Sequence, residues 1–121
     1  MQFMFPEEIE VWYVLPALRR EMSKELKKLG FSSTAIAKKL AITKGAVSQY
    51  LSKKRGCEVV FDEKIKSMIK KSARNITNGG DAVPELRKIL LKISKTDVIC
   101  KIHKKYASLP VNCRWCKNDW H

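Results

Sequence analysis

Apolar side chains recur every three to four residues along most of the chain, which is the spacing of a helix with one buried face. The spacing is clear in residues 17–29, where Leu18, Met22, Leu26 and Leu29 repeat. Two later stretches repeat it with Ile65, Met68, Ile69, Ala73 and Ile76, and with Val98, Ile99, Ile102, Tyr106 and Leu109. The pattern predicts an all-α fold in which residues 59–61 are the only plausible strand.

Capping and turn residues predict where these helices begin and end. Pro6 and an acidic first turn suit a helix over residues 6–15, and Pro16 is expected to break or restart it. Ser32 or Ser33, Thr43 and Asp62 are expected to cap helices that run to about residues 40, 52 and 75. Residues 78–81 form a turn. The helix after it opens at Pro84 and has an apolar face of Val83, Leu86, Leu90 and Ile93. We expect two regions. Residues 1–60 form an N-terminal region, and residues 61–121 form a helical C-terminal region.

The charge of the chain narrows the class of partner. Its 121 residues include 25 Lys or Arg against 12 Asp or Glu, which gives a net charge of +13 and a pI near 9.8. Residues 16–56 hold 11 of the basic and two of the acidic residues, so they carry +9 of this excess. A folded protein with such a local basic patch is expected to meet a polyanion, either nucleic acid or an anionic membrane surface.

Other features of the composition exclude several classes. The chain has no run of 18 uncharged apolar residues, which is the length needed to cross a membrane. Acidic residues interrupt its apolar N-terminus, which is not the pattern of a signal peptide. We therefore expect a cytoplasmic protein whose cysteines stay reduced. The chain has no Gly-rich phosphate loop and no paired-carboxylate site, so an enzyme is not expected.

Residues 32–56 have the pattern of two short helices joined by a tight turn. Ile36, Ala37 and Leu40 would face inward from the first helix, and Val47 and Leu51 from the second. Residues 41–43 form the turn, with Ile42 inward. The other side of the second helix presents short or polar residues, namely Lys44, Gly45, Ser48 and Gln49. Such a surface suits insertion into the major groove of DNA.

This stretch, SSTAIAKKLAITKGAVSQYLSKKRG, resembles the helix-turn-helix of phage-repressor and Cro-like (XRE-type) transcription regulators. Residues 16–56 are similar, more narrowly, to small predicted archaeal regulators, and VSQYLSKKRG is the most specific part. The resemblance implies a supporting helix over residues 33–40 and a recognition helix over residues 43–52. It further implies that Lys44, Ser48 and Gln49 face base edges, and that Thr43, Lys53, Lys54 and Arg55 lie near phosphates. Gly45, on the same outer face, is a further candidate DNA-binding position.

Two positions depart from the family pattern. Ala41 stands where many relatives have a glycine in a left-handed conformation, so the turn is expected to differ slightly here. Ser33 and Thr34 occupy the region where many relatives have a Gln that touches a phosphate, and they are the candidate DNA contacts there.

The expected function is that of a sequence-specific regulator that binds double-stranded DNA as a homodimer, because one helix pair reads only one half-site. The apolar N-terminal residues Phe3, Phe5, Ile9, Trp12 and Tyr13, or the C-terminal helices, could form the dimer; alternatively the N-terminal residues cap the monomer core. Two other functions remain open. One is a basic protein that binds RNA or chromatin without sequence preference, and the other is an antitoxin-type interaction protein.

Three of the four cysteines lie in the last 22 residues, in the pattern Cys100-x2-His103 followed by Cys113-x2-Cys116. Two ligands from a helix and two from a turn can complete a tetrahedral site, so we expect a structural zinc ion. An iron–sulfur cluster is the alternative, and a Cys113–Cys116 redox dithiol is the third option. The remaining alternative is that these cysteines are ordinary buried thiols, that His103 is solvated, and that no metal is bound. The similar archaeal regulators often carry such a four-ligand tail.

Cys57 is expected to be a buried small residue beneath residues 59–61. It would replace His103 as a ligand only if the tail folds back onto the DNA-binding half. The terminal His121 is expected to take no part.

Overall fold

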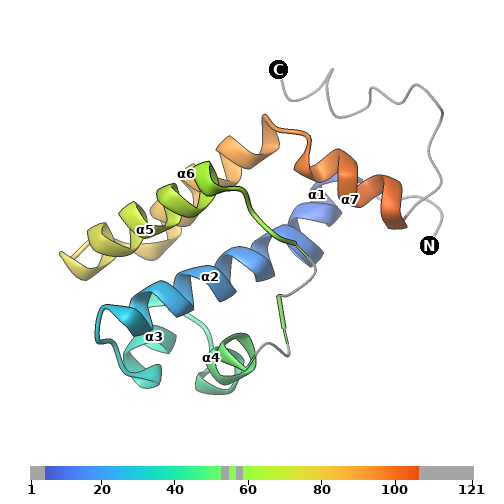
Figure 1. The fold of residues 1–121 in the computed structure, drawn as a ribbon. Coiled ribbons are helices and arrows are strands. Elements are labelled where there is room, and N and C mark those ends of the chain that lie inside the picture. The colour runs from blue at the N-terminus through green and yellow to red at the C-terminus, as the bar shows by residue number, and fades with distance from the viewer. Residues whose placement is uncertain (1–4, 53–54, 57–58, 107–121) are drawn as a thin grey trace.

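A computed structural model describes residues 5–52, 55–56 and 59–106 of the chain, and it is all-α (Figure 1). The elements are α1 (Pro6–Ile9), a π-helical turn (Glu10–Val14), α2 (Leu15–Lys28), α3 (Ser33–Leu40), α4 (Lys44–Leu51), α5 (Glu63–Thr77), α6 (Ala82–Ser94) and α7 (Val98–Tyr106). Residues 59–61, the only plausible strand in the sequence, do not form one, because they lie between α4 and α5 without pairing to another described segment. No helix within the described ranges has both the length and the apolar character needed to cross a membrane.

The first helical stretch continues through Pro16, where the sequence predicted a break. Residues 6–28 are helical without interruption, with a π-helical turn just before the proline. In that turn the Leu15 N–H donates to the carbonyl of Glu10, five residues earlier. A proline ring crowds the carbonyl four residues before it and supplies no N–H. The wider turn gives the backbone another way to satisfy its hydrogen bonds, so the helix continues past Pro16.

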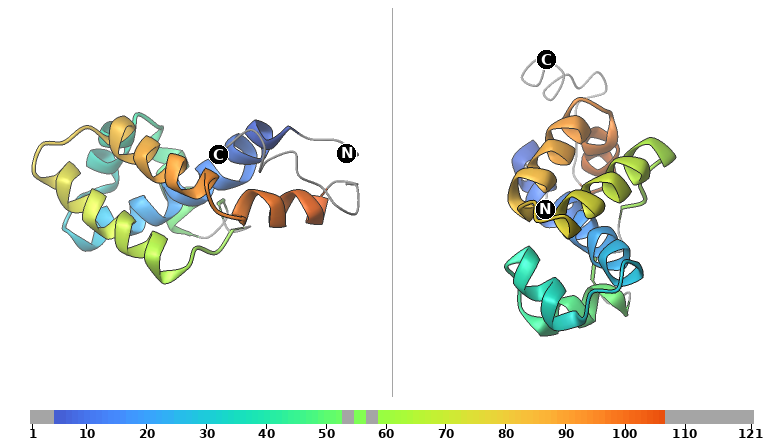
Figure 2. Two further views of the ribbon diagram at one scale, coloured as in Figure 1. Left: turned by 90° about the horizontal axis from the view of Figure 1, so that it is seen from above. Right: turned by 90° about the vertical axis from the view of Figure 1, so that its left-hand side faces the viewer.

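Helix α2 is the centre of the molecule. It packs against the α3–α4 pair on one side and against α5 on the other, and α6 packs against α5. Figures 1 and 2 show α3 and α4 at one end and α1 beside α7 at the opposite end. Buried residues from Ile9 to Ile102 form one contiguous cluster, so the residues on both sides of position 60 share a core.

The apolar faces were largely predicted, with two exceptions. Leu29 and Val83 were assigned to buried faces but are exposed. Leu29 is the C-cap residue just after α2, and Phe31 packs against the core after the chain turns. Helix α6 begins at Ala82, before Pro84, and buries Ala82, Leu86, Ile89 and Ile93. Val83 is therefore rotated away from that face.

Candidate nucleic-acid interface

The α3–α4 pair is closed by local hydrogen bonds that the sequence predicts. The Ala35 N–H donates to Ser32 Oγ over 3.1 Å, and the Ala46 N–H donates to Thr43 Oγ1 over 3.0 Å, so each helix has a side-chain N-cap. Between them, Ala41 has φ 55° and ψ 44°, the left-handed conformation. The Ile42 N–H donates to the Ala37 carbonyl over 3.0 Å, which closes the end of α3. Ala41 thus adopts the left-handed conformation that glycine favours.

The inner side of α4 holds it against α2 and α3. Ala46, Val47 and Tyr50 are buried there, while Leu51 is half-buried. Tyr50 was not among the predicted core residues, although it lies three positions after Val47 and so shares its face. The Arg55 guanidinium lies over the Tyr50 ring, 5.4 Å from its centroid. This contact packs Arg55 against the C-terminal end of α4.

The outer side of α4 brings together the four residues predicted to form the DNA-facing surface of the helix. Lys44, Gly45, Ser48 and Gln49 are all exposed. A Cβ at Gly45 would meet only Thr43 Oγ1, at the ordinary contact distance of 3.9 Å. Packing within the protein therefore does not require glycine at this position, and a glycine in a helix costs up to about 1 kcal/mol relative to alanine. Close approach of another molecule to the helix would explain it.

The predicted phosphate-contacting residues lie around this helix. Thr34, Thr43 and Arg55 are exposed, and Ser33 is half-buried at the start of α3. The Thr43 hydroxyl oxygen is occupied as the cap of α4, but its hydrogen can still be donated to a phosphate oxygen. Lys53 and Lys54 lie outside the described residues.

Acidic residues are absent from a long stretch of this part of the chain, although Lys28 pairs with Glu25 just before it. Eight Lys or Arg and no Asp or Glu occur between Glu25 and Glu58; they are Lys27, Lys28, Lys38, Lys39, Lys44, Lys53, Lys54 and Arg55. Within the described part of the chain, no carboxylate lies within 4.0 Å of Lys38, Lys39 or Lys44. Their positive charge is therefore available to an outside partner.

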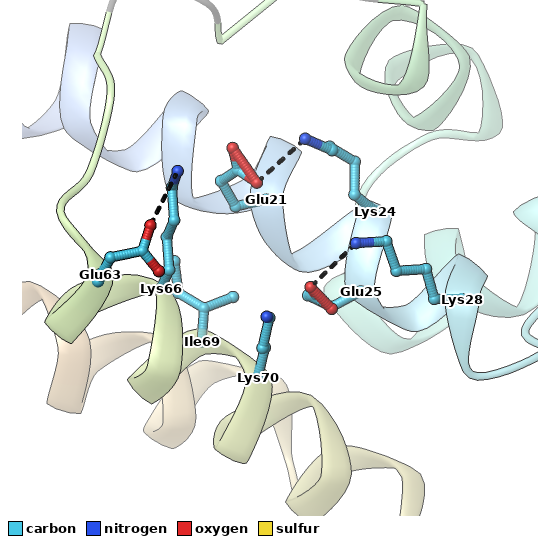
Figure 3. A pocket seen from close by; sticks show the side chains of 8 residues that line it. All are labelled: Glu21, Lys24, Glu25, Lys28, Glu63, Lys66, Ile69 and Lys70. Carbon is cyan, nitrogen blue, oxygen red and sulfur yellow. Dashed lines mark hydrogen bonds and ion pairs between the residues drawn. The ribbon is translucent and has the colours of Figure 1, made fainter.

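A cleft of about 270 Å³ between α2 and α5 contrasts with this surface (Figure 3). Its lining includes Lys24, Lys28 and Lys66, and each of these pairs with a Glu three residues earlier on its own helix. The N–O distances are 3.4 Å to Glu21, 3.5 Å to Glu25 and 4.0 Å to Glu63. Most of the positive charge in the cleft is thus offset internally, so the cleft is a poorer site for an anion than the α3–α4 surface.

The predicted metal ligands are only partly within the described residues. Cys100 and His103 lie in α7, three positions apart, which places them one helical turn from each other. Cys100 is half-buried and packs against the core. Cys113 and Cys116 lie outside the described residues, as does Cys57. No group of three His, Cys, Asp or Glu side chains suited to a metal occurs in the part that is described.

Comparisons with protein-family models, with curated proteins and with solved structures find no match for this chain. What the protein does must therefore be inferred from its own residues.

Proposed function

We propose that the protein is a sequence-specific DNA-binding transcription regulator in which α3 and α4 form a helix-turn-helix. Helix α4 would enter the major groove, and α3 would support it across the backbone. One observation carries this proposal: the outer side of α4 is exposed, short and polar, and it includes a glycine that the fold does not need. A solvent-facing helix without a ligand would gain stability from alanine at that position.

The residues on α4 suit base recognition. The amide of Gln49 can make two hydrogen bonds to adenine, and Lys44 can donate to guanine or to a phosphate. The uncompensated lysines of α3 and α4 would displace counterions from the DNA backbone, so binding should weaken steeply with salt. The homodimer expected from the sequence would let two copies of α4 read two half-sites. DNA binding is also consistent with the cytoplasmic location expected from the sequence.

The test begins with selection of a preferred duplex from a random pool, followed by anisotropy titrations at several salt concentrations. We expect log affinity to fall linearly with log salt. Gln49→Ala should reduce the preference for the selected duplex over random DNA by about 1–3 kcal/mol and leave affinity for random DNA nearly unchanged. Gly45→Ala should weaken binding while the free energy of unfolding stays equal or rises by up to about 1 kcal/mol.

A charge-matched control separates specific contacts from net charge. Lys44→Ala and Lys92→Ala remove the same charge from exposed positions, but Lys92 lies on α6 rather than on the α3–α4 pair. Only Lys44→Ala should weaken binding markedly. Equal affinity for selected and random duplexes would instead favour a non-specific RNA- or chromatin-binding protein. A second protein that copurifies in fixed ratio, with no preferred duplex, would favour an antitoxin.

The proposal extends to a metal site formed by Cys100, His103, Cys113 and Cys116. The described residues fit this set so far as they reach, because Cys100 and His103 lie one turn apart on α7 and Cys100 is not fully buried. Zinc would join the tail to α7 as a structural clasp, and an iron–sulfur cluster is the alternative. Metal analysis and an absorption spectrum of anaerobically purified protein distinguish the two. Full-length protein that contains neither metal would contradict the site.

A further inference from the structure

The end of the molecule opposite α3 and α4 exposes a group of apolar side chains. Phe5, Val11 and Trp12 are 73%, 58% and 47% exposed, and all three lie in the first ten described residues. Ile9 and Val14, in the same stretch, are fully buried. The N-terminal segment therefore contributes to the core with one set of residues and leaves another set uncovered by the described part of the chain.

This grouping differs from the other exposed apolar residues. Leu29 and Val60 lie in connections between helices, and Val83 and Leu91 lie eight positions apart on α6. Isolated exposed apolar residues of this kind are common on protein surfaces. Three within two helical turns, including a tryptophan and a phenylalanine, are typical of a contact surface, because aromatic residues are enriched there.

The charge of the same segment is opposite to that of the protein. Residues 5–14 contain Glu7, Glu8 and Glu10 and no Lys or Arg. Neither Glu7 nor Glu10 has a cation within 4.0 Å among the described residues. Burial, together with the neighbouring Glu7, raises the pKa of Glu10 above its usual value. The segment is thus an acidic surface on a chain of net charge +13, and Glu7 and Glu10 form no ion pair with the described residues.

Helix α7 lies beside α1 and carries the complementary charge. It contains Lys101, Lys104 and Lys105 and no Asp or Glu, and Lys101 pairs with Asp97, just before the helix, over 3.4 Å. An acidic, apolar helix next to a basic helix is self-complementary under a two-fold axis, because the acidic helix of each copy then approaches the basic helix of the other. Elsewhere two copies of so basic a chain would repel each other.

We propose that Phe5, Val11 and Trp12 form the contact with a second copy of this chain, with the acidic α1 of each copy against the α1–α7 end of the other. The inference rests on the proposed function, since a two-fold dimer is what a helix-turn-helix needs to read two half-sites. It leaves α3 and α4 of both copies clear of the contact, because they lie at the other end of the molecule (Figure 2).

Sedimentation equilibrium of the full-length chain without DNA tests the contact. The wild type should shift from 13.9 kDa toward twice that mass as its concentration rises. Phe5→Ser and Trp12→Ser should each weaken dimerisation, Trp12→Ser by about 30-fold or more if it is a central contact residue. Leu91→Ser and Val83→Ser, at similarly exposed apolar positions on α6, should not change it. Phe5 is mostly exposed, so its substitution tests the contact even if Trp12→Ser perturbs folding.

A wild type that stays at 13.9 kDa at every concentration would overturn the inference, as would Phe5 and Trp12 variants that dimerise like the wild type. If the wild type stays monomeric and the amides of α1 exchange slowly, the surface formed by Phe5, Val11 and Trp12 is covered by another part of the same chain.

DNA titrations separate this failure from that of the proposed function. Phe5→Ser should keep the affinity of the wild type for a single half-site and lose affinity only for the full duplex. If Lys44→Ala and Gln49→Ala leave DNA binding unchanged while Phe5→Ser abolishes the dimer, the contact stands and the proposed function fails.

Discussion

The α3–α4 and α5–α6 pairs are closed by turns of the same kind. In the first pair Ala41 has φ 55° and the Ile42 N–H reaches the Ala37 carbonyl. In the second pair Gly79 has φ 99° and the Gly80 N–H reaches the Asn75 carbonyl over 2.8 Å. Both turns thus use one left-handed residue and one hydrogen bond across six residues. The difference between the pairs is not in how the chain turns.

The pairs differ in what they present to solvent and in how they are held. Helix α4 presents Gly45, Ser48 and Gln49, whereas α6 exposes Val83 and Leu91. The α5–α6 pair has a side-chain hydrogen bond between its helices, from Asn75 Nδ2 to Glu85 Oε1 over 3.1 Å. The α3–α4 pair has none between its described residues, and it is held by apolar packing on α2. Similar inner packing therefore leaves the outer surfaces free to differ, and function is to be sought in the outer surface.

The largest effect is expected where the chain leaves α4. Gly56 is buried with φ 75°, and a Cβ there would lie 2.5 Å from the carbonyl oxygen of Pro16 on α2. Gly56→Ala should lower the free energy of unfolding by about 2–4 kcal/mol, because it combines left-handed strain with a backbone clash. Chemical denaturation of the full-length protein measures the change.

Gly79→Ala is the matched control, from the turn of the other pair. Gly79 has φ 99°, but nothing lies within 4 Å of its Cβ position. Gly79→Ala should therefore lower the free energy of unfolding by only the cost of left-handed strain, about 1 kcal/mol. Equal losses in the two variants would show that the segment after α4 is not seated on α2.

The local features of both pairs could be predicted from the sequence. Ser32, Thr43 and Asp62 are N-caps as expected, because a cap depends on residues only three positions apart. The outer side of α4 was likewise predicted from spacing alone. The continuation through Pro16 was not, because it depends on a rare backbone adjustment.

Contacts between distant residues were also missed. A buried glutamate is not expected from sequence, and buried Glu85 accepts hydrogen bonds from Asn75, ten residues earlier, and from Lys88. Burial of Tyr50 depends on how closely α4 packs on α2. The zinc or iron–sulfur site stays a prediction, since Cys113 and Cys116 lie outside the described residues.

The hydrogen bond between α5 and α6 gives the second prediction. Asn75 holds the pKa of Glu85 below its usual value of 4.5, although burial acts in the opposite direction. Ionised Glu85 therefore stabilises the fold above that value, and this contribution is lost as the pH falls through the folded-state pKa. Asn75→Ala should cost about 1–2 kcal/mol at neutral pH, and the cost should shrink in acid as Glu85 becomes protonated in both proteins.

Unfolding curves of the wild type and Asn75→Ala at pH 7 and pH 3 check this dependence (about four pH units span the carboxylate titration). Asn78→Ala, at an exposed position three residues further along, serves as the control and should show no such pH dependence. A deficit in Asn75→Ala that is as large in acid as at neutral pH would mean that the hydrogen bond does not favour the ionised form.

The smallest effect is expected at Ala41, and it tests whether the two turns are equivalent. Among the described residues, Ala41 is the only one other than glycine with a positive φ. Its Cβ causes strain in this conformation, whereas Gly79 has no Cβ and no such strain. Ala41→Gly should raise the free energy of unfolding by about 0.5–1 kcal/mol, because relief of left-handed strain exceeds the added entropy of the unfolded chain. The change should be opposite in sign to that of Gly79→Ala, measured by the same denaturation experiment. If Ala41→Gly instead destabilises the protein, the first turn is not left-handed at Ala41, and α4 leaves α3 in another direction.

Under the proposed function, the direction of α4 determines which of its residues can reach the DNA groove. If the turn keeps its shape, the DNA affinity of Ala41→Gly should therefore stay close to that of the wild type.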